Sequence, residues 1–314
     1  MVRVPIVRPW SITDSKKNYT AFIAAVGYEL RARYIAETYA PNANTRFAFA
    51  FPDRKVHHYT ANYNWYVDAG YSVAEVTDES FAEWCKRVIG QSRQSDLTSQ
   101  SLCIDISSLS RKRIAVLVDT LRRLDWVERV HVDFLYSLAE YSPPPDEIGP
   151  NTHVGPVLPS FAGWTTEPDR PAVAIVGLGY EEGKALGAVE HIQAAEVWAF
   201  EPVSPITQYS GDLEKANRTL LESIPRARRM TYPVSQPIDC FVILESLTNR
   251  LCQSSSPVLF PFGPKIFTLC ALLVACLHPG AAVWRVSSEV GGEAADRAPS
   301  PFIFGLSVEF SLPS

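Results

Sequence analysis

Short apolar segments with strand character alternate with helix-like segments along most of this 314-residue chain. In the first half, strands are predicted at residues 20–26, 46–51, 71–76, 101–106 and 129–136, and helices at 30–39, 62–69, 78–90 and 110–124. Strands that alternate regularly with helices are typical of βα units, whose strands form a parallel sheet. The sequence therefore predicts an α/β fold.

The alternation is interrupted once and then resumes. Residues 142–170 are rich in proline and glycine, which predicts a connecting arm, and the apolar side chains of this arm indicate that it packs on the rest of the protein. Beyond the arm, strands are predicted at 172–176, 196–200, 229–232, 258–261 and 281–286, and helices at 182–192, 212–224, 237–251 and 264–277. The polar tail at 289–301 is expected to be mobile, and residues 302–312 to form a last strand or a docking segment.

The two series share a short motif. Gly-Tyr-Glu follows the first strand of each series, beginning at Gly27 and at Gly179, which are 152 residues apart. The later elements keep this spacing within a few residues. We therefore predict an internal duplication, with two tandem Rossmann-like units and mainly parallel sheets. The expected division is residues 1–141 for the first unit, 142–170 for the arm, and 171–314 for the second unit with its C-terminal tail.

Composition excludes several classes of protein. The hydrophobic fraction of 46% excludes wholesale disorder, and the net charge of -5 argues against a dedicated surface for duplex nucleic acid. The N-terminus has no apolar signal-peptide core, and the most apolar stretch, residues 266–277, is shorter than the roughly 20 residues that cross a bilayer. We expect a cytoplasmic protein that does not enter a membrane.

Cysteine and histidine spacing gives no metal site. The six cysteines are scattered and are expected to be buried thiols in a reducing compartment. His57 and His58 are adjacent, so their side chains would point apart on a strand, and surface histidines are the favoured interpretation. The aromatic cluster at residues 59–66 could stack on a base, but on a helix it more often belongs to the core or an interface.

Ligands of open parallel sheets bind beyond the carboxyl ends of the strands, where the strand order reverses. The residues predicted to lie there in the first unit are Gly27, Tyr28, Glu29, Pro52, Asp53, Asp105, Ser107, Ser108 and Arg111. Those in the second unit are Gly177, Gly179, Tyr180, Glu181, Glu201, Pro202, Gly263 and Lys265. The glycines would let the backbone approach a ligand, and the helix starts beside Arg111 and Lys265 suit an anion.

Two acidic residues, Asp105 and Glu201, are the candidates for a catalytic role. Asp105 ends an apolar strand, where it is either a catalytic carboxylate or a cap for the following helix. Gly177-x-Gly179 with Glu201 resembles the nucleotide loop of methyltransferases and dehydrogenases, although the third glycine, Gly183, stands one position late. Whether the chain is an enzyme, and which cofactor it would take, stays open at this point.

A wider resemblance rests on two turns. Residues 261–265 read Pro-Phe-Gly-Pro-Lys before the apolar helix, and Asp105-Ile-Ser-Ser occupies the equivalent place in the first unit. This layout resembles the CARF and SAVED sensor domains of prokaryotic defence systems, which bind cyclic oligonucleotides and pass the signal to an effector. The resemblance implies a pocket built from residues 27–29, 107–111, 179–181 and 263–265. No effector is recognisable in the sequence, so either the effector is a separate chain or the sensor interpretation is wrong.

Three hypotheses follow. The first is a nucleotide-sensing or regulatory module that takes a small anionic or nucleotide ligand and works with a separate effector or complex partner, with a homodimer as a candidate assembly. The second is a nucleotide-dependent transferase that uses Gly177, Gly179 and Glu201. The third is an interaction scaffold, for which an apolar surface near residues 157–164 or 302–312 would be the signature.

Overall fold

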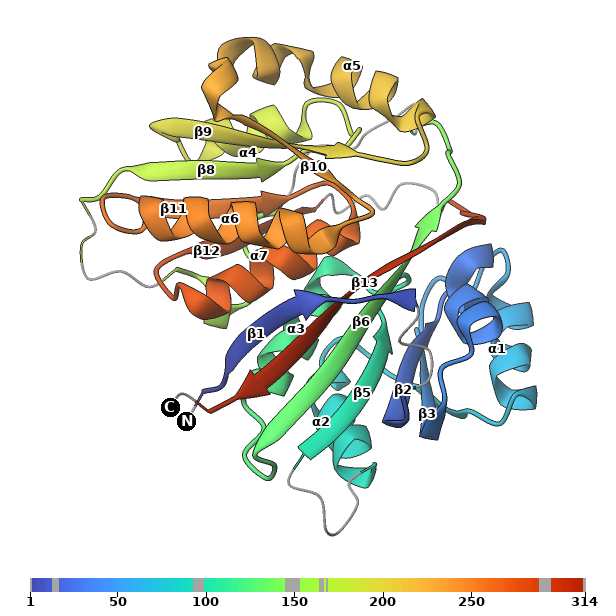
Figure 1. Ribbon diagram of the computed structural model, residues 1–314. Helices are drawn as coiled ribbons and strands as arrows, with labels where there is room; N and C mark the ends of the chain where they lie inside the picture. Colours follow the sequence, from blue (N-terminus) through green and yellow to red (C-terminus); the bar gives the residue numbers. More distant parts are fainter. Residues whose placement is uncertain are drawn as a thin grey trace. The chain divides into compact units, whose positions relative to one another are not determined.

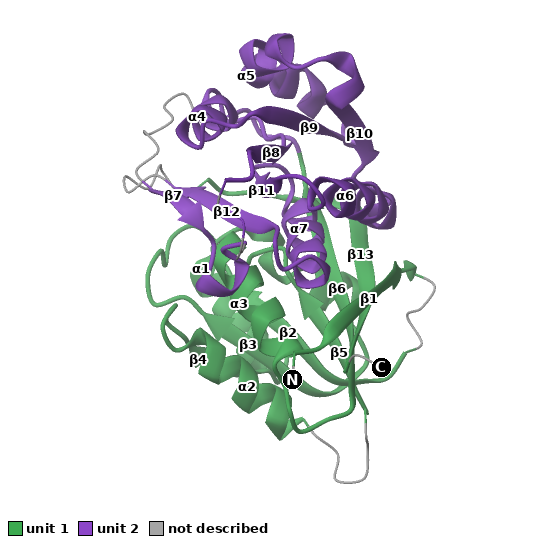
Figure 2. Cartoon of the chain, turned by 90° about the vertical axis from the view of Figure 1, so that its left-hand side faces the viewer, with its two compact units in different colours: residues 1–140, 294–314 green, residues 141–293 purple. Residues whose placement is uncertain are grey.

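The chain folds into two compact units, Met1–Glu140 with Ala294–Ser314 and Tyr141–Glu293, which Figure 2 shows in different colours. The computed structural model describes residues 2–12, 17–92, 99–144, 153–163, 167, 169–287 and 295–312. Each unit holds one mixed, mainly parallel sheet, of seven strands in unit 1 and six in unit 2. The predicted fold class, an α/β chain with two Rossmann-like units, is confirmed.

Unit 1 contains seven strands, with short helices between the parallel ones (Figure 1). Its strands are β1 (Val4–Pro9), β2 (Tyr19–Val26), β3 (Ala43–Ala50), β4 (Ser72–Glu75), β5 (Ser99–Asp105), β6 (Arg129–Ala139) and β13 (Pro299–Ser311). Its helices are η2 (Leu30–Arg33), η3 (Ile35–Tyr39), α1 (Tyr59–Asp68), α2 (Phe81–Gln91) and α3 (Arg111–Arg122).

The sheet of unit 1 has the order β1-β13-β6-β5-β2-β3-β4. The strands from β6 to β4 are parallel, whereas β13 runs antiparallel to both β6 and β1. All eight residues of β2 are buried, because this central strand is covered on both faces. The chain moves outward from β2 to β3 and β4 and then crosses back to β5, so the strand order reverses between β2 and β5.

Unit 2 repeats this plan in the second part of the chain. Its strands are β7 (His153–Pro156), β8 (Ala172–Gly177), β9 (Glu196–Val203), β10 (Arg229–Pro233), β11 (Ser256–Pro261) and β12 (Ala282–Ser287). Its helices are η4 (Pro159–Phe161), α4 (Lys184–His191), α5 (Gln208–Ser223), η5 (Arg226–Arg228), α6 (Pro237–Leu251) and α7 (Lys265–Leu277).

The two sheets have the same topology. Unit 2 has the order β10-β9-β8-β11-β12-β7, and its parallel strands β12-β11-β8-β9-β10 correspond to β6-β5-β2-β3-β4 of unit 1. The outer strand next to the parallel set is antiparallel in both units, β13 in one and β7 in the other. In unit 2, α6 and α7 pack together on one face of the sheet, and α4 and α5 lie on the other (Figure 1). The order reverses between β8 and β11.

Two edge strands, β1 and β7, have no counterpart among the predicted strands. Each carries prolines: β1 reads Val-Pro-Ile-Val-Arg-Pro, and β7 lies within the proline-rich segment predicted to be an arm. Proline removes a ladder hydrogen bond, so it counts against a strand in sequence patterns, yet a sheet edge tolerates it. The segment after β7 packs into unit 2, where Val157 and Phe161 are 5% and 1% exposed.

The C-terminal strand belongs to the first unit and not, as expected, to the second. β13 pairs with β6 over most of its length and with β1 on its other side. The reason is pairing between strands far apart in the sequence, which local patterning does not report. Residues 289–294 of the tail predicted to be mobile lie outside the described residues, while residues 299–301 are already part of β13.

Residues 30–39, which were predicted as one helix, do not form a regular α-helix. It forms a 3-10 turn, η2, followed by a π-helical turn, η3. The N–H groups that would start an α-helix bind elsewhere: Leu30 N donates to Asp296 Oδ1 at 2.9 Å, and Arg31 N donates to the Arg297 carbonyl at 3.1 Å. Contacts with the C-terminal segment thus satisfy the free N–H groups at the start of this turn.

The most apolar stretch of the chain is a core helix, as predicted. Every residue of α7 from Ile266 to Cys276 is buried. Within the described residues, no helix combines the length and hydropathy that a membrane crossing requires. All six cysteines are free thiols, and all but Cys252 are buried.

Candidate functional site

The reversal point of unit 1 lies between the loops that follow β2 and β5. Gly27 starts the first loop, and Ser108 belongs to the second. A Cβ added to Gly27 would lie 2.9 Å from both Cβ and Oγ of Ser108, and 3.2 Å from the Cβ of Ala32. The two loops therefore touch at Gly27, because only a residue without a side chain allows this approach. The Ser108 hydroxyl oxygen is buried and has no hydrogen-bond partner within the described part of the chain.

A buried polar network lies under these loops. Asp105, at the end of β5, accepts a hydrogen bond from Ser107 N at 2.8 Å, and Ser107 Oγ accepts one from Ser137 N on β6 at 2.8 Å. The Ser137 carbonyl in turn accepts from Arg31 Nη1 at 2.9 Å, and Arg31 Nε lies 2.5 Å from Glu29 Oε2. The network thus connects the ends of β2, β5 and β6 through groups that are almost fully buried.

Arg31 is the cation of this network. Burial alone would lower the pKa of Arg31, but the Glu29 carboxylate and the Tyr136 hydroxyl outweigh burial and hold that pKa above its ordinary value. The Arg31 guanidinium also lies 5.7 Å from the centre of the Tyr136 ring. Glu29 is therefore engaged by a protein cation, which makes it a weaker candidate for direct contact with a ligand.

Hydrogen bonds from a buried asparagine also hold the loop after β2 in place. Asn62 on α1 is 1% exposed, and its side-chain amide donates to the carbonyl oxygens of Gly27 and Glu29, both at 2.9 Å. Tyr28, between these two residues, points its ring to His57 at a centroid distance of 5.9 Å. Burial raises the pKa of Tyr28, against the lowering effect of the nearby Arg54 guanidinium.

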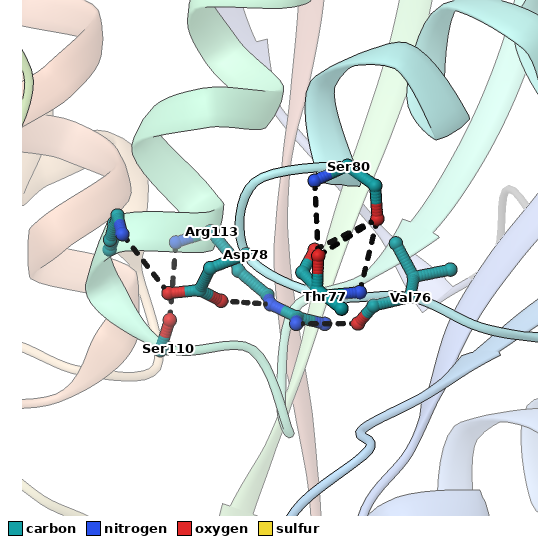
Figure 3. Close-up of polar contacts among 7 residues, drawn as sticks. Val76, Thr77, Asp78, Ser80, Ser110 and Arg113 are labelled. Atoms are coloured by element: carbon teal, nitrogen blue, oxygen red, sulfur yellow. Dashed lines mark hydrogen bonds and ion pairs between the residues drawn. The ribbon is translucent and has the colours of Figure 1, made fainter.

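The start of α3 is fixed beside the loop after β5. Ser110 caps this helix, its Oγ accepting from Arg113 N at 3.2 Å. Arg113 donates to Asp78 Oδ1 and to the Val76 carbonyl, both at 2.8 Å (Figure 3). Its guanidinium also lies 4.3 Å from the centre of the Phe51 ring. The cap is therefore Ser110, while Asp105 instead closes the turn before it.

Acid should weaken unit 1 through Asp78. Burial would raise the pKa of this carboxyl, but hydrogen bonds from Arg113 and Lys112 outweigh burial and hold the pKa below its ordinary value of 3.8. The stabilisation is then complete above pH 3.8 and is lost as the pH falls through the lower folded pKa. We expect Asp78→Asn to lower the urea midpoint at neutral pH and to differ progressively less from the wild type on acidification. A gap that stays constant with pH would contradict this assignment.

The reversal point of unit 2 brings together the loops after β8 and β11. The N–H groups of Phe262 and Gly263 both donate to the Gly177 carbonyl, at 2.9 and 3.0 Å. A Cβ on Gly179 would lie 2.7 Å from the Phe262 carbonyl oxygen, and one on Gly263 2.5 Å from the Leu178 carbonyl oxygen. A Cβ on Gly177 would meet the Phe267 ring at 2.3 Å. At all three glycines, the space beside Cα is occupied by the protein itself.

The Gly-Tyr-Glu loop of unit 2 is held as its counterpart is. Asn217 on α5 is 3% exposed and donates to the Gly179 carbonyl at 2.7 Å, as Asn62 does to the loop of unit 1. Tyr180 stacks on Tyr209 with ring centres 5.7 Å apart and an interplanar angle of 28°. Glu181 Oε2 pairs with Lys184 Nζ at 2.8 Å. In both units, then, the tyrosine meets a ring from the segment after the second strand, and the glutamate meets a nearby cation.

The structure places Glu201 within a strand and Lys265 at the start of a helix. Glu201 lies within β9, paired with Thr231, and not beyond the carboxyl end of the strand. Burial raises its pKa, against the lowering effect of Arg229. Lys265 is the first residue of α7, after Pro264 at the cap position, and is partly exposed. Arg111 holds the matching first position of α3 in unit 1.

Most predicted site residues therefore gather at one reversal point in each unit. The residues at the reversal point of unit 1 are Gly27, Tyr28, Glu29, Asp105, Ser107, Ser108 and Arg111, and those of unit 2 are Gly177, Gly179, Tyr180, Glu181, Gly263 and Lys265. Arg31, Asn62, Ser137 and Asn217 were not predicted. The two asparagines follow their motifs at similar distances, which is the one sequence signal that could have found them. Within the described segments, no group of three His, Cys, Asp or Glu is arranged to hold a metal ion.

Comparison with known proteins adds a structural likeness. No family model matches the sequence, and no curated protein matches it. Among solved structures, the chain is similar to one described as a type III CRISPR defence DNA nuclease activated by cyclic oligoadenylate. The TM-score is 0.50 and the identity 10%, over 85% of this chain and 65% of the nuclease chain. The likeness shows a shared fold. This chain spans somewhat less than two thirds of the length of that nuclease.

Proposed function

We propose that this chain is a nucleotide-sensing or regulatory module that works with a separate effector chain. The observation that carries the proposal is the repeated construction of the reversal point. Each unit places a Gly-Tyr-Glu loop there, holds it with a buried asparagine from the helix after the second parallel strand, and sets an aromatic ring against the tyrosine. Reversal points of parallel sheets are where such folds bind nucleotides.

The shared fold suggests the ligand class to test first. The matched nuclease is described as activated by cyclic oligoadenylate, and its likeness covers 85% of this chain. The loops of this chain offer groups that suit such a ligand: the starts of α3 and α7 beside Arg111 and Lys265 for phosphate, and the rings of Tyr28 and Tyr180 for bases. A role in prokaryotic defence is part of the same proposal.

The transferase hypothesis draws no support from the loop of unit 2. A nucleotide loop uses its glycines to let the backbone approach the ligand. Here the space beside Gly177 is filled by the Phe267 ring, and the space beside Gly179 by the Phe262 carbonyl. The scaffold hypothesis gains little from the segment at 157–164, because Val157 and Phe161 are buried and Trp164 lies outside the described residues.

Calorimetry tests the proposal directly. We expect the wild-type protein to bind a cyclic oligoadenylate more tightly than linear oligoadenylate of the same length, ATP or S-adenosylmethionine. Circular dichroism on the same sample confirms that the protein is folded. Folded protein that binds none of the cyclic nucleotides would overturn the sensing proposal, and tight binding of S-adenosylmethionine alone would favour the transferase. Analytical ultracentrifugation with and without ligand would test the homodimer.

A further inference from the structure

The segment that joins β3 to α1 lies beside the loop after β2, which is one of the two loops at the reversal point of unit 1. Val26 and Ala50 are register partners at the ends of β2 and β3, so the chain leaves both strands side by side. The backbone of the following segment is tied to the Gly-Tyr-Glu loop, because His58 N donates to the Tyr28 carbonyl at 3.1 Å. Residues 53–58, here called the β3–α1 segment, therefore border the same loop as Gly27.

This segment has an unusual backbone. Arg54 and His57 adopt positive φ values of 58° and 49°, and neither is a glycine. Left-handed conformations cost free energy in residues with a Cβ, and they persist only where surrounding contacts impose them. The contacts are present: Tyr59 N donates to the Val56 carbonyl at 3.0 Å, and His58 Nε2 lies 3.0 Å from Asp296 Oδ2.

The strained residues present their side chains to Tyr28. The His57 ring is tilted by 50° to the Tyr28 ring at 5.9 Å, and the Arg54 guanidinium lies within electrostatic range of the Tyr28 phenol. Both Arg54 and His57 are exposed. An aromatic pair with an exposed guanidinium beside it matches a nucleotide, whose base stacks on rings and whose phosphate accepts bidentate hydrogen bonds from arginine.

Several neighbouring acids pair with other cations. Glu29 pairs with Arg31, Glu75 with Lys55 at 2.6 Å, and Asp296 with His58. Asp53 is the exposed acid next to Arg54 in the sequence. In unit 2 the equivalent ring pair, Tyr180 with Tyr209, adjoins an acid instead, since Tyr141 contacts Tyr209 edge-on and donates to Asp212 at 2.5 Å.

We propose that the β3–α1 segment is a ligand-binding wall of unit 1, in which Arg54 binds a phosphate group of the nucleotide and His57 with Tyr28 stacks on its base. The inference rests on the proposed sensing function and adds the residues that recognise the ligand. In unit 1 it adds Arg54 to the phosphate-binding groups already proposed.

Glycine substitutions test this wall without disturbing the backbone. Arg54→Gly and His57→Gly remove the side chains at positions where glycine is favoured, so both variants should keep or raise the thermal midpoint. We expect Arg54→Gly to weaken binding of cyclic oligoadenylate by about 10- to 100-fold and to reduce its salt dependence. His57→Gly should weaken binding by about 10-fold with the salt dependence unchanged.

Two control variants complete the experiment. Lys86→Gln removes one exposed positive charge from α2, and Gln193→Gly relieves a positive φ of 49° in unit 2; both should bind as the wild type does. If the wild type binds and Arg54→Gly and His57→Gly bind equally well, the wall is wrong while the sensing function stands. If the folded wild type binds no nucleotide, both proposals fall.

Discussion

Arg31→Met should destabilise unit 1 by about 3–5 kcal/mol, which is the usual cost of removing one partner from a buried ion pair. The variant would leave the Glu29 carboxylate, 12% exposed, without its counter-ion and the Ser137 carbonyl without its donor. It would also remove the cation beside the Tyr136 ring. Urea denaturation measures the loss, and hydrogen exchange of β5 and β6 assigns it to unit 1.

Two companion variants sharpen this result. Arg33→Met, in the same turn, removes a half-buried partner of the exposed Glu37 and should change stability by no more than about 1 kcal/mol. The double variant Arg31→Met with Glu29→Gln should recover part of the loss, because it no longer buries an unpaired charge. A loss for Arg31→Met as small as that of Arg33→Met would show that the network does not hold the strand ends together.

Gly263→Ala should destabilise unit 2 by about 1–3 kcal/mol, as overpacking of a close contact does. The new Cβ would lie 2.5 Å from the Leu178 carbonyl oxygen, so the loops after β8 and β11 would have to separate. The Gly263 N–H also donates to the Gly177 carbonyl, and this bond would lengthen as the loops part. Thermal unfolding of the variant against the wild type measures the effect.

A glycine-to-alanine substitution elsewhere in unit 2 should have the opposite effect on stability. Gly211 lies inside α5 and has nothing within 4 Å of its missing Cβ. Gly211→Ala should therefore stabilise the protein by about 0.5–1 kcal/mol, since alanine loses less backbone entropy in a helix. If both variants raised the thermal midpoint, the loop contact at Gly263 would not be tight, and its glycine would need another explanation.

Much of the architecture was predictable from local patterns. The helix at 237–251 was predicted with both of its bounds, and the strands of both parallel sets were found within a few residues. Buried strands and amphipathic helices leave periodic apolar patterns, so these elements can be recognised without their neighbours. The edge strands β1 and β7 were not predicted, because proline counts against a strand in sequence patterns although an edge strand tolerates it.

The candidate site was predictable only in part. The Gly-Tyr-Glu motifs marked both loops because the motif repeats in the sequence. Arg31 did not stand out, since a charged residue in a helical pattern is normally solvent-exposed, and its burial depends on Glu29 and on a carbonyl of β6. Asn62 and Asn217 bind backbone carbonyls, which every residue carries. No complementary side chain in the sequence therefore indicates the role of either asparagine.

The sequence by itself determined the two series of βα units and the place of the Gly-Tyr-Glu loop in each, because burial and turn chemistry are recorded residue by residue along the chain. Tertiary structure alone decided that β13 completes the sheet of unit 1, since strand pairing joins segments that are remote in the sequence. It also decided the role of the glycines. Beside Gly27, Gly177, Gly179 and Gly263 the neighbouring protein fills the space a side chain would take, and that contact exists only once the loops meet.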